Sequence, residues 1–178
     1  MWRYIYTFKE RIYVNMTYII PIIAIVLGVA LDQYTKALAV KHLADGPIPL
    51  IEGVFELKYL ENRGAAFGML QNQQTFFLIV TILTLILMTI LYIRMPHTKR
   101  FLPLRICLVS IVAGAIGNMI DRVTLKYVID FFYFKLIDFP IFNVADIFAT
   151  CASILLILLL FVYYKEEDID EIYKAIKR

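Results

Sequence analysis

Four long apolar stretches dominate this sequence and limit the folds that it can adopt. Residues 12–31 contain no charge over twenty positions, and residues 76–93 and 147–164 contain none over eighteen positions each. A fourth run, 106–120, is shorter, but it can begin a turn earlier if the Arg105 side chain extends to the membrane interface. A helix of about 20 apolar residues spans a bilayer. The sequence therefore predicts transmembrane helices at about 12–31, 76–93, 102–120 and 147–164.

Composition supports this class. Of 178 residues, 61% are hydrophobic and only 19% are charged, and the mean hydropathy is +0.74. Soluble domains are about half apolar and a quarter charged. The length allows one domain, which we expect to be an α-helical integral membrane protein. Its net charge of +3 comes from basic residues that flank the membrane segments, so we predict no nucleic-acid partner.

The distribution of Lys and Arg predicts the orientation. Eleven lie in the N-terminal arm, the 94–105 connection and the C-terminal tail, 165–178, whereas seven lie in the two intervening segments, 32–75 and 121–146. Cytoplasmic loops carry the excess of basic residues. We therefore expect both termini to be cytoplasmic and the segments 32–75 and 121–146 to be extracytoplasmic. The first apolar run could instead be a cleaved signal peptide, but charged Asp32 and Lys36 follow it, which favours a retained helix.

Carboxylates lie at several predicted helix ends, where they are costly unless paired or functional. Asp32 and Lys36 are four residues apart and would form a structural pair on one helix face. Asn118 shares a helix face with Asp121 and Arg122, and the amide and guanidinium groups offer donors for a peptide or a carboxylate.

Asp146 and Asp130 each allow two interpretations. In the segment FNVAD, Asn143 is a candidate N-cap and Asp146 would be the third helical residue, where a carboxylate accepts a backbone N–H. Asp130 lies between Ile129 and Phe131 without a nearby base, and it could be an exposed acid on an amphipathic strand. Local sequence alone does not separate these structural roles from catalytic ones.

Five segments together resemble a known family. They are DQYTK (32–36), ENRGAAFG (61–68), GAIGNMIDR (114–122), VIDF (128–131) and FNVAD (142–146). The chain resembles the lipoprotein signal peptidases, signal peptidase II, over roughly residues 17–164. The resemblance implies four transmembrane helices and a small extracytoplasmic β-sheet. It also implies an aspartyl endopeptidase of the bacterial plasma membrane that cleaves prolipoproteins on the amino side of a diacylglyceryl-modified cysteine.

The same resemblance implies the roles of individual residues. Asp130 and Asp146 would be the catalytic pair. Residues that would support the site or bind substrate are Asp32, Lys36, Asn62, Gly64, Asn118, Asp121, Arg122 and Asn143. Two carboxylates that share a proton can activate water and protonate a leaving amine without a cofactor or metal. We expect the proton to rest on Asp130, among apolar neighbours, and Asp146 to act as the base.

Other features leave alternatives open. Cys107 and Cys151 lie in separate apolar runs without metal-ligand spacing, and we expect both to be small buried residues. A proton- or ion-coupled carrier could use Asp32, Asp121 and Asp146 as relay acids, although no inverted repeat is visible. A scaffold without chemistry is a further alternative. The expected partners of a peptidase are diacylglyceryl-modified prolipoproteins and membrane lipid, and a monomer is favoured.

Overall fold

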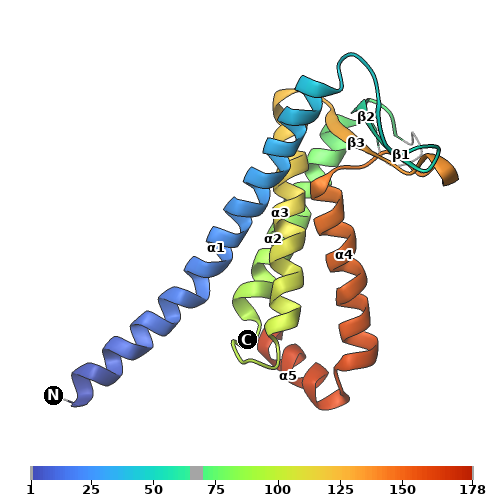
Figure 1. Cartoon of the computed structure of the whole chain (residues 1–178). Coiled ribbons are helices and arrows are strands. Elements are labelled where there is room, and N and C mark those ends of the chain that lie inside the picture. The colour runs from blue at the N-terminus through green and yellow to red at the C-terminus, as the bar shows by residue number, and fades with distance from the viewer. Residues whose placement is uncertain (1, 65–69, 178) are drawn as a thin grey trace.

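The computed structural model describes residues 2–64 and 70–177, with side chains from residue 16 onward. Helices form a long stem, and a small sheet lies at one end of it (Figure 1). In chain order the elements are α1 (Trp2–His42), β1 (Ile48–Ile51), β2 (Phe55–Asn62), α2 (Gln74–Arg94), α3 (Leu102–Thr124), β3 (Val128–Tyr133), the 3₁₀ turn η2 (Lys135–Ile137), α4 (Val144–Leu158), the π-helical turn η3 (Leu159–Tyr163) and α5 (Glu166–Lys177).

The prediction of four membrane-spanning helices is confirmed. Within the described residues, four helices are long and apolar enough to cross a bilayer: Met16–His42, Gln74–Arg94, Leu102–Thr124 and Val144–Tyr163. Helix α1 continues beyond the predicted span, through residues 32–42. Asp32 and Lys36 do not end the helix because they are buried and paired with each other, so neither charge has to reach water.

The three strands form one antiparallel sheet in the order β1-β2-β3, which confirms the predicted small sheet. Leu60 pairs with Asp130, and Asn62 pairs with Val128. Asn62 and Asp130 are therefore diagonal neighbours on one face of the sheet, close enough for their side chains to meet. The sheet thus places a catalytic candidate beside an amide from the neighbouring strand.

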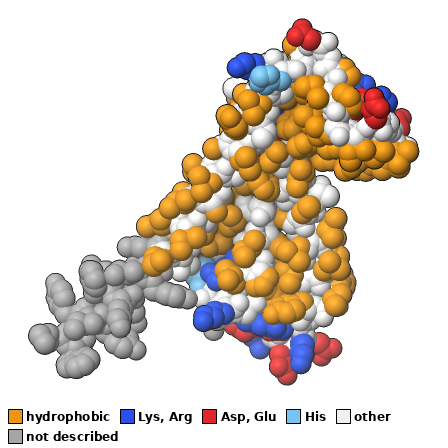
Figure 2. All heavy atoms as spheres, viewed as in Figure 1, with side chains coloured by type: hydrophobic (Ala, Val, Ile, Leu, Met, Phe, Trp, Pro, Cys, Tyr) orange, Lys and Arg blue, Asp and Glu red, His pale blue; other side chains and the backbone are white. Residues whose placement is uncertain are grey.

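The sheet also carries an exposed apolar patch. Figure 2 shows hydrophobic side chains on the underside of the sheet that continue onto the stem, with charged side chains at the two ends of the molecule. The exposed fractions in this patch run from 42% to 70%. Its members are Ile48, Leu50, Ile51, Leu136, Ile137 and Phe139.

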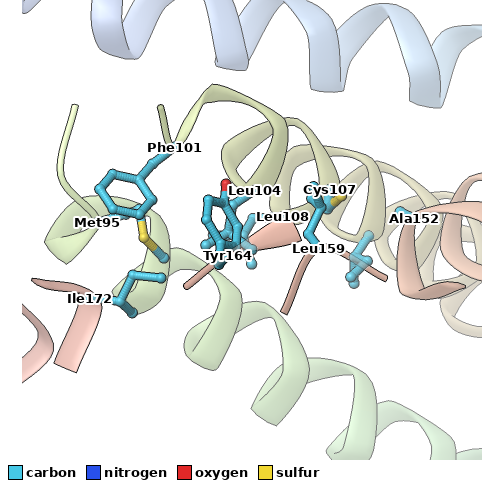
Figure 3. Close-up of a cluster of buried hydrophobic side chains, with 10 residues drawn as sticks. Met95, Phe101, Leu104, Cys107, Leu108, Ala152, Leu159, Tyr164 and Ile172 are labelled. Atoms are coloured by element: carbon cyan, nitrogen blue, oxygen red, sulfur yellow. The ribbon is translucent and has the colours of Figure 1, made fainter. Parts of the chain in front are cut away.

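A second packing centre lies at the opposite end of the stem, where α5 docks. Buried side chains of α3, η3 and α5 meet there with residues of the 95–101 connection (Figure 3). Ile172 brings α5 into this cluster, and Arg100 forms an ion pair with Asp168 at 2.7 Å. Cys107 is buried in the cluster as expected, but the expectation for Cys151 was wrong. Cys151 is exposed because it lies on the outer face of α4, beside exposed Ile154.

Helix α3 packs against α1 and α4 through glycines. A Cβ atom at Gly114 would overlap the carbonyl oxygen of Ala145, and one at Gly117 would lie 2.5 Å from Oδ2 of Asp32. The absence of side chains at these positions lets the backbones approach closely, as small residues commonly do in membrane helices. The close approach sets the first turn of α4 against α3.

We expect Gly114→Leu to force α4 away from α3 and to lower the free energy of unfolding by about 1–3 kcal/mol, the usual cost of overpacking. Thermal unfolding in detergent, followed by circular dichroism, measures this loss. Thr150→Leu, at an exposed position of α4, is the matched control and should unfold like the unmodified protein. Equal unfolding midpoints for the two variants would contradict the packing described for Gly114.

Candidate active site

Polar side chains from five elements or their flanks converge where the stem meets the sheet. The two candidate catalytic residues come from β3 and from the first turn of α4. The supporting residues come from α1, α3, β2, the segment that follows β2, and the N-cap position of α4. The structure brings all ten predicted residues into one hydrogen-bonded network, which Arg122 joins through the backbone oxygen of Asn118. The other nine are Asp32, Lys36, Asn62, Gly64, Asn118, Asp121, Asp130, Asn143 and Asp146.

The first turn of α4 holds Asp146 in a reciprocal cap. Oδ1 of Asn143 accepts a hydrogen bond from the backbone N–H of Asp146 at 2.9 Å, and Oδ2 of Asp146 accepts one from the backbone N–H of Asn143 at 3.2 Å. The predicted capping role is confirmed. The other oxygen, Oδ1, accepts from Nδ2 of Asn118 at 2.8 Å, so a single carboxylate both caps α4 and faces the network.

Asp130 lies in a different environment on β3. Its side chain is 1% exposed, so the alternative of an exposed acid on a strand was wrong. Oδ1 accepts from Nδ2 of Asn143 at 2.7 Å, and Oδ2 accepts from Nδ2 of Asn62 at 2.8 Å. Burial, and then the negative charge of Asp146, raise the pKa of Asp130 to about 7, against the hydrogen bonds from the two amides. This carboxyl group can therefore hold a proton near neutral pH.

Asn143 links the two carboxylates. Its oxygen accepts from the backbone of Asp146, while its nitrogen donates to Asp130 and, at 3.1 Å, to the oxygen of Asn118. The side chain is completely buried. One rigid amide therefore sets the positions of both acids relative to each other.

The ammonium group of Lys36 holds several polar side chains of the site in place. Its Nζ atom lies 2.8 Å from Oδ2 of Asp32 and 2.9 Å from Oδ2 of Asp121, and all three side chains are at most 2% exposed. The predicted pair of Asp32 and Lys36 is confirmed, and Asp121 joins it. Lys36 also donates to Oδ1 of Asn118 at 2.8 Å. Because an ammonium group can only donate, it fixes the Asn118 amide with its NH₂ group toward Asp146.

The two acids beside Lys36 also anchor the surrounding backbone. Oδ1 of Asp32 accepts from the backbone N–H of Ala145 at 2.9 Å, and Oδ2 of Asp121 accepts from that of Ile129 at 3.1 Å. Ala145 precedes one catalytic candidate and Ile129 precedes the other. The ion cluster thereby positions both candidates through their own chain segments.

Asn62 is oriented in the same manner as the other two amides. Its Oδ1 accepts from the backbone N–H of buried Gly64 at 3.0 Å, which leaves its NH₂ group for Asp130. The rest of the ENRGAAFG motif, residues 65–68, lies outside the described residues.

Arg122 is the predicted site residue whose side chain stands at the edge of the network. It is half-buried, its guanidinium lies over the Phe77 ring at 4.9 Å, and Nη1 is 3.4 Å from the backbone oxygen of Asn118. Phe77 was missed from the sequence, where it is one of many aromatic residues in an apolar run. Gln33 was also missed, although it lies inside the DQYTK motif, and its Nε2 donates to Oδ1 of Asp121 at 2.8 Å.

Comparison with known proteins gives concordant matches. Residues 23–162 match the family model described as signal peptidase (SPase) II. Lipoprotein signal peptidases of Streptococcus pyogenes serotype M5 (strain Manfredo) and serotype M18 (strain MGAS8232) are each 43% identical over 148 residues, which cover 83% of this chain and 94% of the relative.

Two solved structures described as bacterial membrane enzymes, at 2.3 and 1.9 Å resolution, share the fold. Their TM-scores are 0.72 and 0.70 with 34% and 33% identity, and the alignments cover 84% and 83% of this chain and 94% and 96% of theirs. The family match contains the sheet and all ten predicted site residues. This bacterial membrane protein therefore belongs to the signal peptidase II family of peptidases.

Proposed function

We propose that this chain removes signal peptides from bacterial prolipoproteins, cutting on the amino side of a diacylglyceryl-modified cysteine, with Asp130 and Asp146 as the catalytic pair. The observation that carries the proposal is the coupling of these two carboxylates through Asn143, in a chain whose relatives are lipoprotein signal peptidases. The predicted supporting residues hold this pair and the substrate.

The two environments suggest different roles for the acids. Asp146 lies at the N-terminus of α4 and accepts hydrogen bonds from Asn143 and Asn118, which stabilise negative charge on it. Asp130 is buried on a strand, away from any helix N-terminus, and burial and the negative charge of Asp146 raise its pKa, so we assign the shared proton to Asp130. Because the two groups titrate together, the assignment describes the more populated of two protonation states.

Amide hydrolysis then needs only these two groups and a water molecule. Asp146 takes a proton from the attacking water, while protonated Asp130 donates a hydrogen bond to the scissile carbonyl oxygen. The carbonyl carbon becomes tetrahedral. Collapse of this intermediate breaks the C–N bond, and the proton passes to the leaving amine of the cysteine.

The carrier alternative is not favoured. Two of its three relay acids, Asp32 and Asp121, are fixed in ion pairs with Lys36. They lie at the same end of the helices as Asp146, in one network, whereas a proton path has to cross the membrane. Membership of a peptidase family weighs against it as well.

The proposed orientation puts both termini in the cytoplasm and the site at the extracytoplasmic face. The basic 94–105 connection supports it, since it lies at the end of the stem opposite the sheet. A lipid-modified cysteine in the outer leaflet would then lie at the level of the site. The exposed apolar patch beneath the sheet suits contact with that leaflet.

We expect Asp130→Asn and Asp146→Asn each to lower the cleavage rate of a diacylglyceryl-modified prolipoprotein by a factor of about 100 to 10,000, as loss of a general acid or base does. Gel-shift assays of the purified protein in lipid nanodiscs measure the rate. Asp45→Asn, the same change at an exposed position, is the control and should cleave normally. Full activity in either catalytic variant would refute the pair, and an inactive unmodified protein would refute the peptidase assignment.

The pH dependence follows from the raised pKa of Asp130. Below about pH 7 the group is protonated and can donate to the carbonyl; as the pH rises through about 7 it loses that proton, so kcat/KM should fall on the alkaline side. The hydrogen bond from Asn62 stabilises the ionised form. Asn62→Leu should therefore raise this pKa and shift the alkaline limb to higher pH. A shift to lower pH, or an unchanged limb, would contradict the assignment of the proton to Asp130.

A further inference from the structure

An apolar groove lies between α1 and α3. Its volume is about 440 Å³. Met16, Pro21 and Gly28 line it on α1, and Arg105, Val109 and Ala113 line it on α3. In Figure 1 the helix α1 leans away from α3 toward its N-terminus. At the end nearer the sheet, a Cβ at Gly28 would touch Ala113 at 3.2 Å and Phe148 at 3.5 Å, so the helices close together there.

The depth of the groove matches one leaflet. Its lining on α3 runs from Leu102 to Ala113, which is about 16 Å at a rise of 1.5 Å per residue. Half of a hydrocarbon core of about 30 Å is nearly the same length. The groove therefore has the reach of a single acyl chain and begins at the interface next to the 95–101 connection.

Arg105 puts a positive charge at that interface end. Its Nη1 contacts Nδ1 of His97 at 3.0 Å, and its Nη2 donates to the backbone oxygen of Thr98 at 3.3 Å. Its Nε has no hydrogen-bond partner among the described residues. Among residues 16–64 and 70–177, no carboxylate forms an ion pair with Arg105. Arg105, which has no acid partner within those ranges, lies at the mouth of an apolar groove, and this arrangement complements a ligand with an anionic head and an apolar tail.

We propose that this groove binds a phospholipid with an anionic headgroup, with one acyl chain between α1 and α3 and its phosphate at Arg105. Basic pockets between transmembrane helices commonly hold acidic headgroups. The hydrophobic segment of a signal peptide fits this charge less well, because its basic n-region would meet Arg105 at the same interface. The Tyr92 hydroxyl donates a hydrogen bond to the backbone oxygen of Thr17 at 2.9 Å, which joins α2 to α1 beside the groove. The lipid would hold α1 against the other helices at the same place.

The test is lipid binding to the purified full chain. Delipidated protein is mixed with phosphatidylglycerol or with phosphatidylcholine, and bound lipid is counted by native mass spectrometry. We expect one phosphatidylglycerol to bind at least ten-fold more tightly than phosphatidylcholine. Arg105→Gln should remove that preference. Lys99→Gln also removes one positive charge, at an exposed position of the adjoining connection, and should keep the preference.

A second pair of variants tests the apolar part of the site. Ala24 lines the groove, and Ala24→Phe should fill it and weaken binding of both lipids at least ten-fold. Val26 is 59% exposed and does not line the groove, so Val26→Phe should bind lipid as the unmodified protein does. Unchanged binding in Arg105→Gln and Ala24→Phe would overturn the proposal. Displacement of the lipid by a signal-peptide segment, with tighter peptide binding in Arg105→Gln, would make the groove a peptide site instead.

Discussion

The buried ammonium group of Lys36 is the interaction on which the rest of the site depends. Asp32 and Asp121 flank it, and a carboxylate buried without such a partner is costly. The arrangement joins α1 to α3, and through the backbones at Ala145 and Ile129 it fixes the start of α4 and the start of β3. Charged groups are costly at membrane depth when they are unpaired. Here they are paired, and they position the polar side chains of the site.

The side-chain amides of three asparagines connect this ion cluster and its surroundings to the catalytic candidates. Asn62, Asn118 and Asn143 each present their oxygen to a group that can only donate, so their NH₂ groups face carboxylates. Capping and catalysis then coincide in Asp146, since one oxygen closes the first turn of α4 and the other faces the network. Placing Asp130 on a strand, apart from any helix N-terminus, makes the two environments unequal. Unequal environments suit a pair in which one member holds a proton and the other accepts one.

The two ends of the stem differ in their packing and in the surfaces that they expose. At the sheet end, the polar network is enclosed and an apolar patch is exposed beneath the strands. At the other end, α5 closes the bundle through Ile172 and the ion pair of Arg100 with Asp168. The groove at Arg105 lies near that end, so the proposed lipid site and the proposed peptidase site occupy different depths of the stem.

The sequence by itself determined the class, the four spans, the Asn143–Asp146 cap and the Asp32–Lys36 pair. Each depends on periodicity or spacing within one segment, which local chemistry governs. Only the tertiary structure decided where α1 ends and that Asp130 is buried. It also decided that Gln33 contacts Asp121 and that Phe77 contacts Arg122. Whether a charge ends a helix, or an acid on a strand is exposed, depends on partners that lie far along the chain. Asp121, for example, is 85 residues from Lys36 and reaches it only because α1 and α3 pack together.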